Sequence, residues 1–346
     1  MIKSSGDAFV YRKLSIMADV QVELLKASYG DCIFININDD GEAFIIMIDG
    51  GPAYSYQHKE RGRIKPGVLH DKLDELKNKG KTIDLLIITH VDEDHIGGIK
   101  AWFEHDFPTS DFVQEIWIND DIEIEDITNL QNTSEKAASL ISMLRRKGMP
   151  FCHKLVTGVT KIYGWGRIIV IAPSVTDHNV IAHDIEKNLK NADNENYGIS
   201  IREILKADYK RDKVTPENDA SIAILVQLND GENDLFLGDS NIDTVINAIK
   251  DDDRIEKPLH CKWVKLSHHG SKNNFDPELL EYVNADRYIF STDGSYYGHP
   301  DKEVLAQLVD KTDADIYFNY PERGRSMITN QDIADYPQVL NRIKDI

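Results

Sequence analysis

The chain has 346 residues, with 40 Lys and Arg against 59 Asp and Glu, so its formal net charge at pH 7 is −19. A chain this acidic, without a long basic block, is not a general nucleic-acid coat, because phosphate binding needs Lys and Arg to replace counterions. Its 41% apolar content and its 4 Trp, 14 Tyr and 11 Phe exclude a disordered polyelectrolyte.

The sequence carries no signal for a membrane or for secretion. No stretch approaches the roughly 18 apolar residues that cross a bilayer, and the polar start has no apolar core of a signal peptide. Cys32, Cys152 and Cys261 are widely spaced and form no CxxC pair, which favours a reducing compartment over a disulfide framework. We therefore expect a cytoplasmic protein with no membrane partner.

Apolar periodicity predicts short strands with interspersed helices. Strands are expected at 20–28, 32–37, 43–49, 83–90, 113–119, 161–173 (a pair), 221–228, 234–240, 261–269, 286–292 and 314–319. Helices are expected at 66–79, from 96 onward, and at 134–147, 199–207, 241–250, 276–283 and 301–311. Because strands begin both halves of the chain, we predict an α/β fold of two packed sheets with outer helices.

Two segments depart from this rhythm. Residues 1–18 form an unpatterned polar arm that precedes a domain at 19–346. Residues 174–217 are rich in Asn, Asp and Lys and contain a single short predicted helix. We interpret this second segment as an insertion or lid on the domain.

The segment ITHVDEDHIGG, residues 88–98, holds four side chains of metal-ligand type directly after a buried strand. A loop between a strand and a helix is the usual position of functional groups on a rigid scaffold. Acidic residues and an occasional histidine also occur in ordinary surface loops. The spacing fits two ions, because His90 and Asp92 can face one ion while Asp94 and His95 turn toward its neighbour.

Several motifs in one order resemble a known family. The 88–98 segment resembles the HxHxDH motif of metallo-β-lactamase-fold hydrolases, with Asp92 in place of the middle histidine. This HxDxDH form is similar to the metallohydrolase domain of ComEC-type competence proteins. The other matching segments are VELLKASYGDCIFINI, IIMIDGG, NDASIAILV, FLGDS, VKLSHHGS and STDGSYYGHP. The resemblance covers roughly residues 19–300 and implies a metallo-β-lactamase-like αββα sandwich of two mixed sheets with outer helices.

The resemblance also implies a centre of two divalent metal ions. The implied ligands are His90, Asp92, Asp94, His95, Asp239 and His268. His90 and Asp92 would bind the first ion. Asp94 and His95 would bind the second ion, and Asp239 would bridge both.

Two positions around this ligand set leave alternatives. His268 is expected to complete the second site in preference to His269, because neighbouring residues on an extended chain point apart. Many relatives supply a further histidine before the strand that leads to the Gly-Asp turn, where this chain has Glu217, Asn218 and Asp219. The first ion is therefore expected to be weakly held, rich in water ligands, or absent, with Asn218 as a supporting or substrate-contacting side chain.

The ligand set can be interpreted as chemistry. Three histidines and three carboxylates without a thiolate suit Zn, Mn or Fe, and Asp92 in place of an imidazole shifts the preference toward Mn²⁺. We rank zinc and manganese equally. Two ions roughly 3.5–4 Å apart would hold a bridging hydroxide, lower the pKa of water toward about 7, and clamp a phosphodiester.

The leading hypothesis is a phosphodiesterase or nuclease that acts on DNA or RNA. The alternative is a hydrolase of a small phosphoester, cyclic nucleotide or lactone, which suits the acidic exterior because no long polyanion need approach. A third interpretation makes the chain the hydrolase subunit of a larger assembly. It would then dock a protein partner through residues 174–217 or through the stretch from Asp301.

Two residues are expected to take part in the reaction itself. Asp94 is assigned a catalytic role through the second ion. His299 lies in the YGHP segment, and the resemblance places this histidine at the mouth of the site. It would bind a phosphate oxygen or protonate the leaving group; the alternative is a satisfied structural histidine.

Further residues are candidates for support or substrate contact. Asp49 either shapes the IDGG turn or supports the metal site from beneath. Ser271 in HHGS would orient a ligand or substrate, although Ser beside Gly is common in any turn. Arg61 and Arg63 belong to the basic cluster at 58–65, which would contact phosphates or form a solvated loop.

Overall fold

Two mixed β-sheets organise the computed structural model, which describes residues 18–119, 135–178 and 195–346. The first sheet has the strand order β1 (Asp19–Leu24), β2 (Ile33–Asp39), β3 (Glu42–Ile48), β6 (Leu85–Ile88), β7 (Ile116–Ile118), β8 (Phe151–Cys152). The second has the order β16 (Ile343–Asp345), β15 (Asp315–Phe318), β14 (Val283–Phe290), β13 (Leu259–Lys265), β12 (Asn233–Phe236), β11 (Ala223–Leu228), β10 (Gly166–Ala172), β9 (Thr160–Tyr163). Each sheet joins antiparallel strands to a run of parallel ones.

The two sheets pack face to face through alternate side chains of their strands. In β2, Ile33 and Ile35 lie in the core between the sheets, whereas Phe34 lies in the core beneath the first sheet's helices. In β11, Ile224 faces the other sheet and Leu225 faces the second set of helices. Because both faces of these strands are buried, apolar residues occupy consecutive positions in their sequences and do not simply alternate with polar ones.

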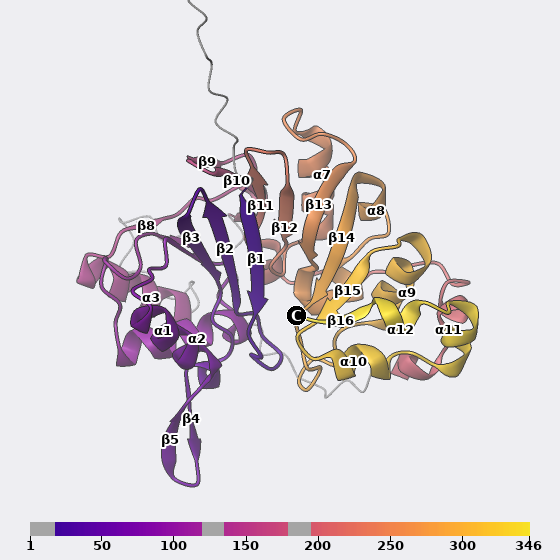
Figure 1. Ribbon diagram of the computed structural model, residues 1–346, viewed down its shortest axis with the longest axis horizontal. Helices are drawn as coiled ribbons and strands as arrows, with labels where there is room; N and C mark the ends of the chain where they lie inside the picture. Colours follow the sequence, from indigo (N-terminus) through magenta and orange to yellow (C-terminus); the bar gives the residue numbers. More distant parts are fainter. Residues whose placement is uncertain (1–17, 120–134, 179–194) are drawn as a thin grey trace, which may run out of the picture.

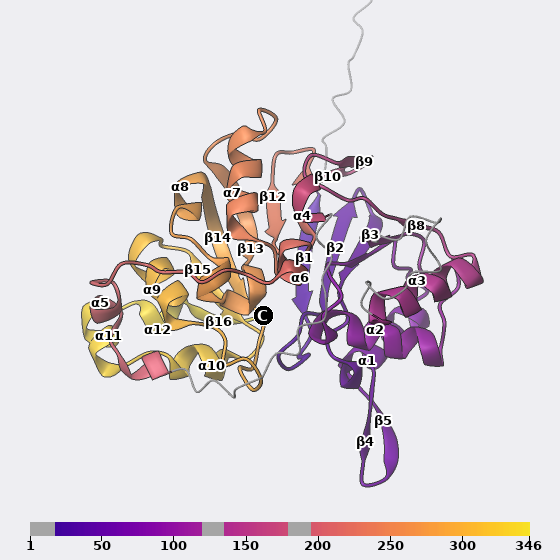
Figure 2. The same cartoon turned by 180° about the vertical axis from the view of Figure 1, so that it is seen from behind.

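Helices cover the outer face of each sheet (Figures 1 and 2). The first sheet carries α1 (Val68–Asn78), α2 (Glu93–His105) and α3 (Glu135–Lys147). The second carries α7 (Ile242–Asp251), α8 (Leu279–Tyr282), α9 (Lys302–Lys311) and the short helices α5 (Ile201–Ile204), α10 (Pro321–Ser326), α11 (Asn330–Asp335) and α12 (Val339–Arg342). The short helices α4 (Val175–His178) and α6 (Pro216–Asp219) complete the described set. The four layers confirm the predicted αββα sandwich of two mixed sheets with outer helices.

The structure differs from the sequence predictions at several element boundaries. Helix α2 begins at Glu93 rather than near residue 96, so Asp94 and His95 lie in its first turn. The basic cluster at 58–65 is a β-hairpin of β4 (Gln57–Glu60) and β5 (Arg63–Pro66), which projects from the sandwich in Figure 1. Its side chains at 58–65 are exposed and, apart from Ile64, polar, so no apolar periodicity marks it.

Parts of two predicted segments lie outside the described residues. These parts are residues 1–17 of the polar arm and residues 179–194 of the insertion. The extent of one domain over 19–346 stays a prediction. None of the described helices has the length and apolar character needed to span a membrane.

Asp234, buried in β12, gives a test of the packing of the second sheet. Burial raises its pKa to about 7, and its Oδ1 accepts a hydrogen bond from the backbone N–H of Trp263 at 2.9 Å. Because an unfolded aspartate titrates near 4, the folded state holds a proton that the unfolded state has released between pH 4 and 7. The contribution of Asp234 to stability is therefore fully present below pH 4 and is lost as the pH rises from 4 through 7.

The variant Asp234→Asn keeps the accepting oxygen and cannot ionise. We expect it to gain stability relative to the wild type by about 1.4 kcal/mol for each pH unit between the two pKa values. Urea unfolding of both proteins at pH 4.5 and pH 8 measures this difference. An identical stability difference at the two pH values would contradict the assignment.

Candidate metal centre

Loops from both sheets meet at one cluster of histidines and carboxylates. The segment with His90, Asp94 and His95 follows β6 of the first sheet, Asp239 follows β12 of the second, and His268 follows β13. The Nε2 atom of His90 and the Oδ2 atom of Asp239 are 3.7 Å apart, so the cluster joins the two sheets.

Asp239 lies at the centre of the cluster. Its Oδ2 is 3.7 Å from Nε2 of His90, 3.4 Å from Nε2 of His95 and 3.6 Å from Nε2 of His268. Asp92 is half-buried at the rim, with Oδ2 also 3.7 Å from Nε2 of His90. One carboxylate oxygen thus faces three imidazole nitrogens.

A second group of three ligand atoms lies beside the first. It consists of Asp94, His95 and His269, whose ligand atoms all lie within 4.8 Å of one another. The Oδ2 atom of Asp94 is 3.3 Å from Nε2 of His269 and 3.7 Å from Nε2 of His95. His95 belongs both to this group and to the one that contains His90 and Asp239.

The turn that carries the two adjacent histidines is not extended. His268 has φ 46° and ψ 52°, His269 has φ 55° and ψ 20°, and Gly270 continues the turn with φ 85°. A Cβ atom on Gly270 would lie 2.2 Å from the ring of Phe290, so the turn requires glycine at this position. The extended-chain premise used to prefer His268 is wrong here. The structure places His269 with Asp94 and His95, and it places His268 against Asp239.

Unpartnered nitrogen and oxygen atoms converge in this cluster. The Nε2 atoms of His90 and His95 and the Oδ1 atom of Asp239 are buried without a hydrogen-bond partner. Buried polar atoms without partners are rare in folded proteins, and each calls for an ion, water or ligand. Converging imidazole and carboxylate atoms form a donor set that suits a divalent cation. The residues therefore fit the metal centre that the resemblance implies.

Asp49 supports the first-sheet histidines from beneath. It is fully buried, and its Oδ2 lies 2.8 Å from Nδ1 of His95. The hydroxyl of Thr89 donates to the same oxygen at 2.6 Å and lies 3.0 Å from Nδ1 of His90. Asp49 thus holds a proton on Nδ1 of both rings, directly or through Thr89, and leaves each Nε2 lone pair directed into the cluster. The turn and the supporting role proposed for Asp49 occur together, since its φ is 56°.

Asn274 and Asn218 hold the His268 ring. The amide nitrogen of Asn274 donates to the backbone oxygens of Asp239 at 2.9 Å and Ser240 at 3.3 Å. This leaves the Asn274 Oδ1 to accept from Nδ1 of His268 at 3.0 Å. The amide nitrogen of Asn218 lies 3.0 Å from the same ring nitrogen, and it can donate to that nitrogen only in the other tautomer of His268. Asn218 thus contacts His268 at the place where the resemblance implies a further histidine.

A buried ion pair holds the His269 ring. Its Nδ1 lies 2.7 Å from the backbone oxygen of Ser291 and 3.3 Å from Oδ1 of Asp31. The Asp31 carboxylate pairs with the ammonium of Lys265, and both side chains are buried. No sequence motif singled out Lys265, Thr89 or Asn274 as supporting residues. For Lys265 a signal exists, because a charge within an apolar strand requires a buried partner.

Glycine turns fix the segment that carries His90 to His95. A Cβ atom on Gly30 would lie 2.0 Å from the backbone oxygen of Asp94, and the N–H of Asp31 donates to that oxygen at 3.1 Å. The N–H of Gly50 donates to the backbone oxygen of His95 at 2.8 Å. The Gly-Asp and IDGG turns thus hold the loop after β6 in place through backbone contacts.

Opposite charges shift the pKa values of the buried groups. Burial alone would raise the pKa of Asp239, but His95 and His268 outweigh it and hold that pKa well below its usual value. Burial would lower the pKa of His269, but the carboxylates of Asp31 and Asp239 raise it to about 9. Burial dominates at His268 and lowers its pKa to about 4. The central carboxylate therefore stays ionised and attracts cations.

The remaining predicted residues lie at different distances from the cluster. The His299 ring is 5.0 Å from the His268 ring between centroids, and its Nδ1 lies 3.5 Å from Oδ2 of Asp301. Ser271 is buried, and its Oγ accepts from the backbone N–H of Asn273 at 3.3 Å, which is a turn role.

Arg61 and Arg63 are exposed on the β4–β5 hairpin, which projects away from the two sheets. No contact joins either side chain to the cluster among the described residues. The structure therefore brings His299 to the metal centre but not the two arginines.

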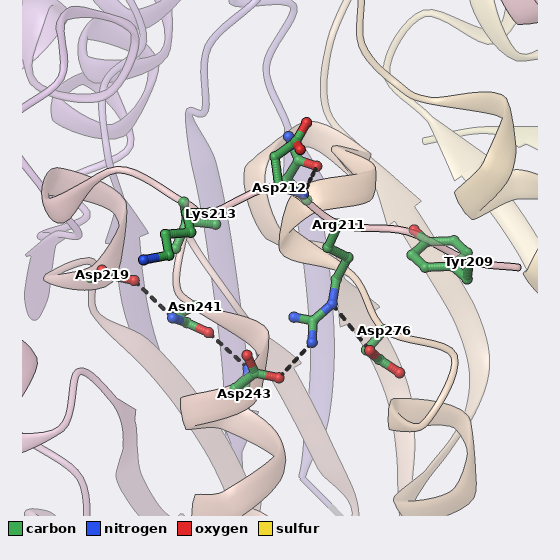
Figure 3. A pocket seen from close by; sticks show the side chains of 10 residues that line it. Tyr209, Arg211, Asp212, Lys213, Asp219, Asn241, Asp243 and Asp276 are labelled. Carbon is green, nitrogen blue, oxygen red and sulfur yellow. Dashed lines mark hydrogen bonds and ion pairs between the residues drawn. The ribbon is translucent and has the colours of Figure 1, made fainter.

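An open pocket of about 570 Å³ is lined by residues from the segment at 209–219 and by Asn241, Asp243, Asn273 and Asp276 (Figure 3). Asp219 and Asn241 in its wall neighbour Asn218 and Ser240 in the chain. Arg211 at its floor lies 2.8 Å from Oδ1 of Asp243 and 3.1 Å from Oδ2 of Asp276. The lining holds four carboxylates, those of Asp212, Asp219, Asp243 and Asp276, against the two cations Arg211 and Lys213, so its charge disfavours a phosphate.

Comparison with known proteins finds one family model that is similar to the first part of the chain. Residues 25–117 match the family model of the metallo-beta-lactamase superfamily, and they include Asp31, Asp49 and the segment from His90 to His95. No curated protein matches this chain. This part of the chain is therefore similar to the metallo-beta-lactamase superfamily, and the sandwich is consistent with that fold.

Several solved structures are similar to this chain at low identity. An isothiocyanate hydrolase from Delia radicum gut bacteria is 12% identical with a TM-score of 0.39, over 94% of this chain and 95% of that one. A diphosphatase from the PhnP family is 11% identical with a TM-score of 0.36, over 84% and 72%. A long form RNase Z from yeast is 9% identical with a TM-score of 0.40, over 93% and 43%. These likenesses are too distant to indicate an activity for this chain.

Asp49 gives a test of the metal centre that leaves the ligands in place. In Asp49→Asn, an NH₂ group replaces one accepting oxygen and the negative charge beside His95 is lost. The NH₂ group must then face either the backbone N–H of Thr89 or the Thr89 hydroxyl and Nδ1 of His95, so the hold on the His95 ring is weakened. We expect the affinity for Zn²⁺ or Mn²⁺ to fall by roughly 10- to 100-fold. Titration against a competing chelator measures this affinity.

A matched control lies on the same pair of strands. The Asp84 carboxylate accepts from the backbone N–H of Ile45 at 2.7 Å, much as Asp49 accepts from Thr89, but it is remote from the cluster. Asp84→Asn should keep the wild-type metal affinity. Equal metal affinities in the Asp49→Asn and Asp84→Asn variants would contradict the role given to Asp49.

Proposed function

We propose that this chain is a dinuclear metal-dependent phosphodiesterase, and that its substrates are nucleic-acid phosphodiesters. The observation that carries the proposal is the position of Asp239, whose one carboxylate oxygen faces imidazoles from loops of both sheets. A buried carboxylate between two ligand groups is the arrangement that two adjacent cations require, because a shared anion offsets their mutual repulsion.

The geometry supports one division of the ligands. His90 and Asp92 would hold the first ion, and Asp239 would be shared. The second ion would be held by Asp94 and His95 together with His269, in place of the His268 expected from the sequence, because these three cluster within 4.8 Å. Divalent ions bound there would supply Lewis acidity and lower the pKa of water toward about 7.

The chain's own residues would position the phosphodiester. His299 lies beside His268 and is 15% exposed, so its ring can reach a bound phosphate oxygen or the leaving group. Asp301 lies near Nδ1 of His299 and would hold that ring in orientation. We keep zinc and manganese as equal choices, since the donor set contains both imidazole and carboxylate.

The β4–β5 hairpin favours a polymeric substrate. It carries His58, Lys59, Arg61, Arg63 and Lys65 on an exposed arm. A basic arm lets phosphates approach a protein whose net charge is otherwise −19. A small phosphoester, cyclic nucleotide or lactone would need no such arm, and this distinguishes the second candidate function.

The cysteines and two surface segments bear on where the protein works and with what partner. The three cysteines are free, and two are buried, which agrees with a reducing cytoplasm. A protein partner would dock on the segment at 174–217 or on the region from Asp301, and it would then contribute additional nucleic-acid contacts.

Metal content and turnover test the proposed function together. Protein purified without chelator and supplied with Mn²⁺ or Zn²⁺ should cleave single-stranded DNA or RNA, and cleavage of a cyclic dinucleotide alone in the same panel would favour the small-substrate alternative. Asp94→Ala and Asp239→Ala should each lose metal retention and reduce turnover to background. Metal-loaded wild type that is inert toward the whole panel would contradict the proposal, and full activity in either variant would show that the ligands are misassigned.

Salt dependence separates a polymer from a small substrate. Each phosphate contact contributes about 0.7 to the slope of log affinity against log salt for a single strand. The double variant Arg61→Ala and Arg63→Ala should therefore lower the slope for single-stranded DNA by about 1.4, with cyclic-dinucleotide affinity little changed. A wild-type slope near zero, or an unchanged slope in the variant, would argue for the small-substrate alternative.

A further inference from the structure

Four tyrosine rings from three separate loops gather beside the metal centre. Tyr29 lies between β1 and β2, Tyr54 in the single helical turn at Ala53–Ser55, and Tyr296 and Tyr297 between β14 and α9. The Tyr29 and Tyr296 rings stack with centroids 4.7 Å apart. The Tyr29 ring also meets Tyr297 at 5.9 Å and Tyr54 at 6.2 Å, both edge to face.

The tyrosine cluster runs from the metal centre to the protein surface. At its inner end, the Tyr297 ring lies 6.2 Å from the rings of both His268 and His299. At its outer end, the Tyr54 side chain is 40% exposed. The backbone beside Tyr29 is also tied to the metal centre, because Gly30 packs closely against the backbone of Asp94.

Packing of the core does not explain these rings. None of the four belongs to the three hydrophobic cores formed by the described residues, and none packs against them as a partly buried neighbour. Tyr29, Tyr296 and Tyr297 are half-buried. Half-buried aromatic surface at the entrance of a polar site favours a ligand that is itself flat and apolar.

The hydroxyl groups of the cluster tolerate a nearby phosphate. Burial, together with the charges of Asp94 and Asp92, raises the pKa of Tyr297, and burial with Tyr54 and Asp94 raises that of Tyr29. Both phenols therefore stay neutral at physiological pH. They add no negative charge next to a phosphodiester.

We propose that the tyrosine cluster is a subsite that stacks on the nucleobase of a nucleotide whose phosphate lies at the metal centre. This inference rests on the proposed function and narrows it to base-bearing phosphodiesters. Stacking is available only to an unpaired base, so the subsite takes single-stranded nucleic acid or a mononucleotide rather than a duplex. It tolerates every base, because every base presents a π face.

Binding of a matched pair of ligands to the metal-loaded protein tests the subsite. Thymidine 5′-monophosphate carries a base, and 2-deoxyribose 5-phosphate carries the same sugar and phosphate without it. Stacking contributes about 1–3 kcal/mol per base, so the wild type should bind the nucleotide roughly 5- to 100-fold more tightly. Tyr54→Ala and Tyr296→Ala should lower this preference, whereas Tyr54→Phe and Tyr296→Phe should retain it because they keep the ring.

The remaining outcomes overturn the inference. Equal wild-type affinity for the two ligands shows that no base subsite exists. A preference that survives both alanine variants shows that the base lies elsewhere, and an equal loss of both ligands shows that the rings only maintain the shape of the site. Phosphodiester cleavage assayed on the same wild-type preparation keeps the two proposals separate. A preference for the base without cleavage would contradict the proposed phosphodiesterase function. Cleavage without a preference for the base would contradict the proposed stacking subsite.

Discussion

The arrangement of the loops around the site depends on one buried carboxylate, that of Asp239, which needs positive charge beside it. Its Oδ2 faces the Nε2 atoms of three histidines, and its other oxygen is buried without a partner. An unpaired buried anion costs several kcal/mol, so the folded state needs positive charge at this point. Protonated imidazole can supply it in the absence of metal, because burial would lower the pKa of His95 but Asp239, Asp94 and Asp49 raise it well above its usual value. The Nδ1 atoms of His90 and His95 lie toward Thr89 and Asp49, so each Nε2 faces the cluster, where a cation can take the place of the Nε2 proton. Divalent cations meet this requirement.

The sandwich serves to hold ligands from two sheets at one point. The loop after β6 is fixed by backbone hydrogen bonds to the turns at Gly30 and Gly50, and its helix begins at once, at Glu93. The loop after β13 is fixed by three consecutive residues with positive φ. Because the supporting hydrogen bonds are buried, the ligands cannot relax individually when the charge at the centre changes. Rigid loops on buried strands thus hold several acidic side chains together as a cation site. Bound cations would make the local electrostatic potential positive, so that it attracts phosphate.

The sequence was sufficient to predict the sandwich and the loop with His90 to His95, because buried strands and a dense ligand motif leave direct patterns. It could not distinguish His268 from His269, since three left-handed residues in a row depend on the close approach of Phe290 to Gly270. The basic hairpin was missed because exposed polar strands carry no apolar alternation. The tyrosine cluster was missed for a different reason. The four rings come together only when both sheets are packed, so no local spacing in the sequence predicts their contact; they are residues 29, 54, 296 and 297.

Anomalous X-ray scattering from crystals grown with Mn²⁺ tests the central claim most directly. The account predicts two peaks that share the Asp239 carboxylate, one within bonding distance of His90 and Asp92 and the other of Asp94, His95 and His269. A single peak bound by His268 instead of His269 would contradict the ligand assignment. No peak at Asp239, in crystals that bind Mn²⁺ elsewhere, would contradict the metal centre itself.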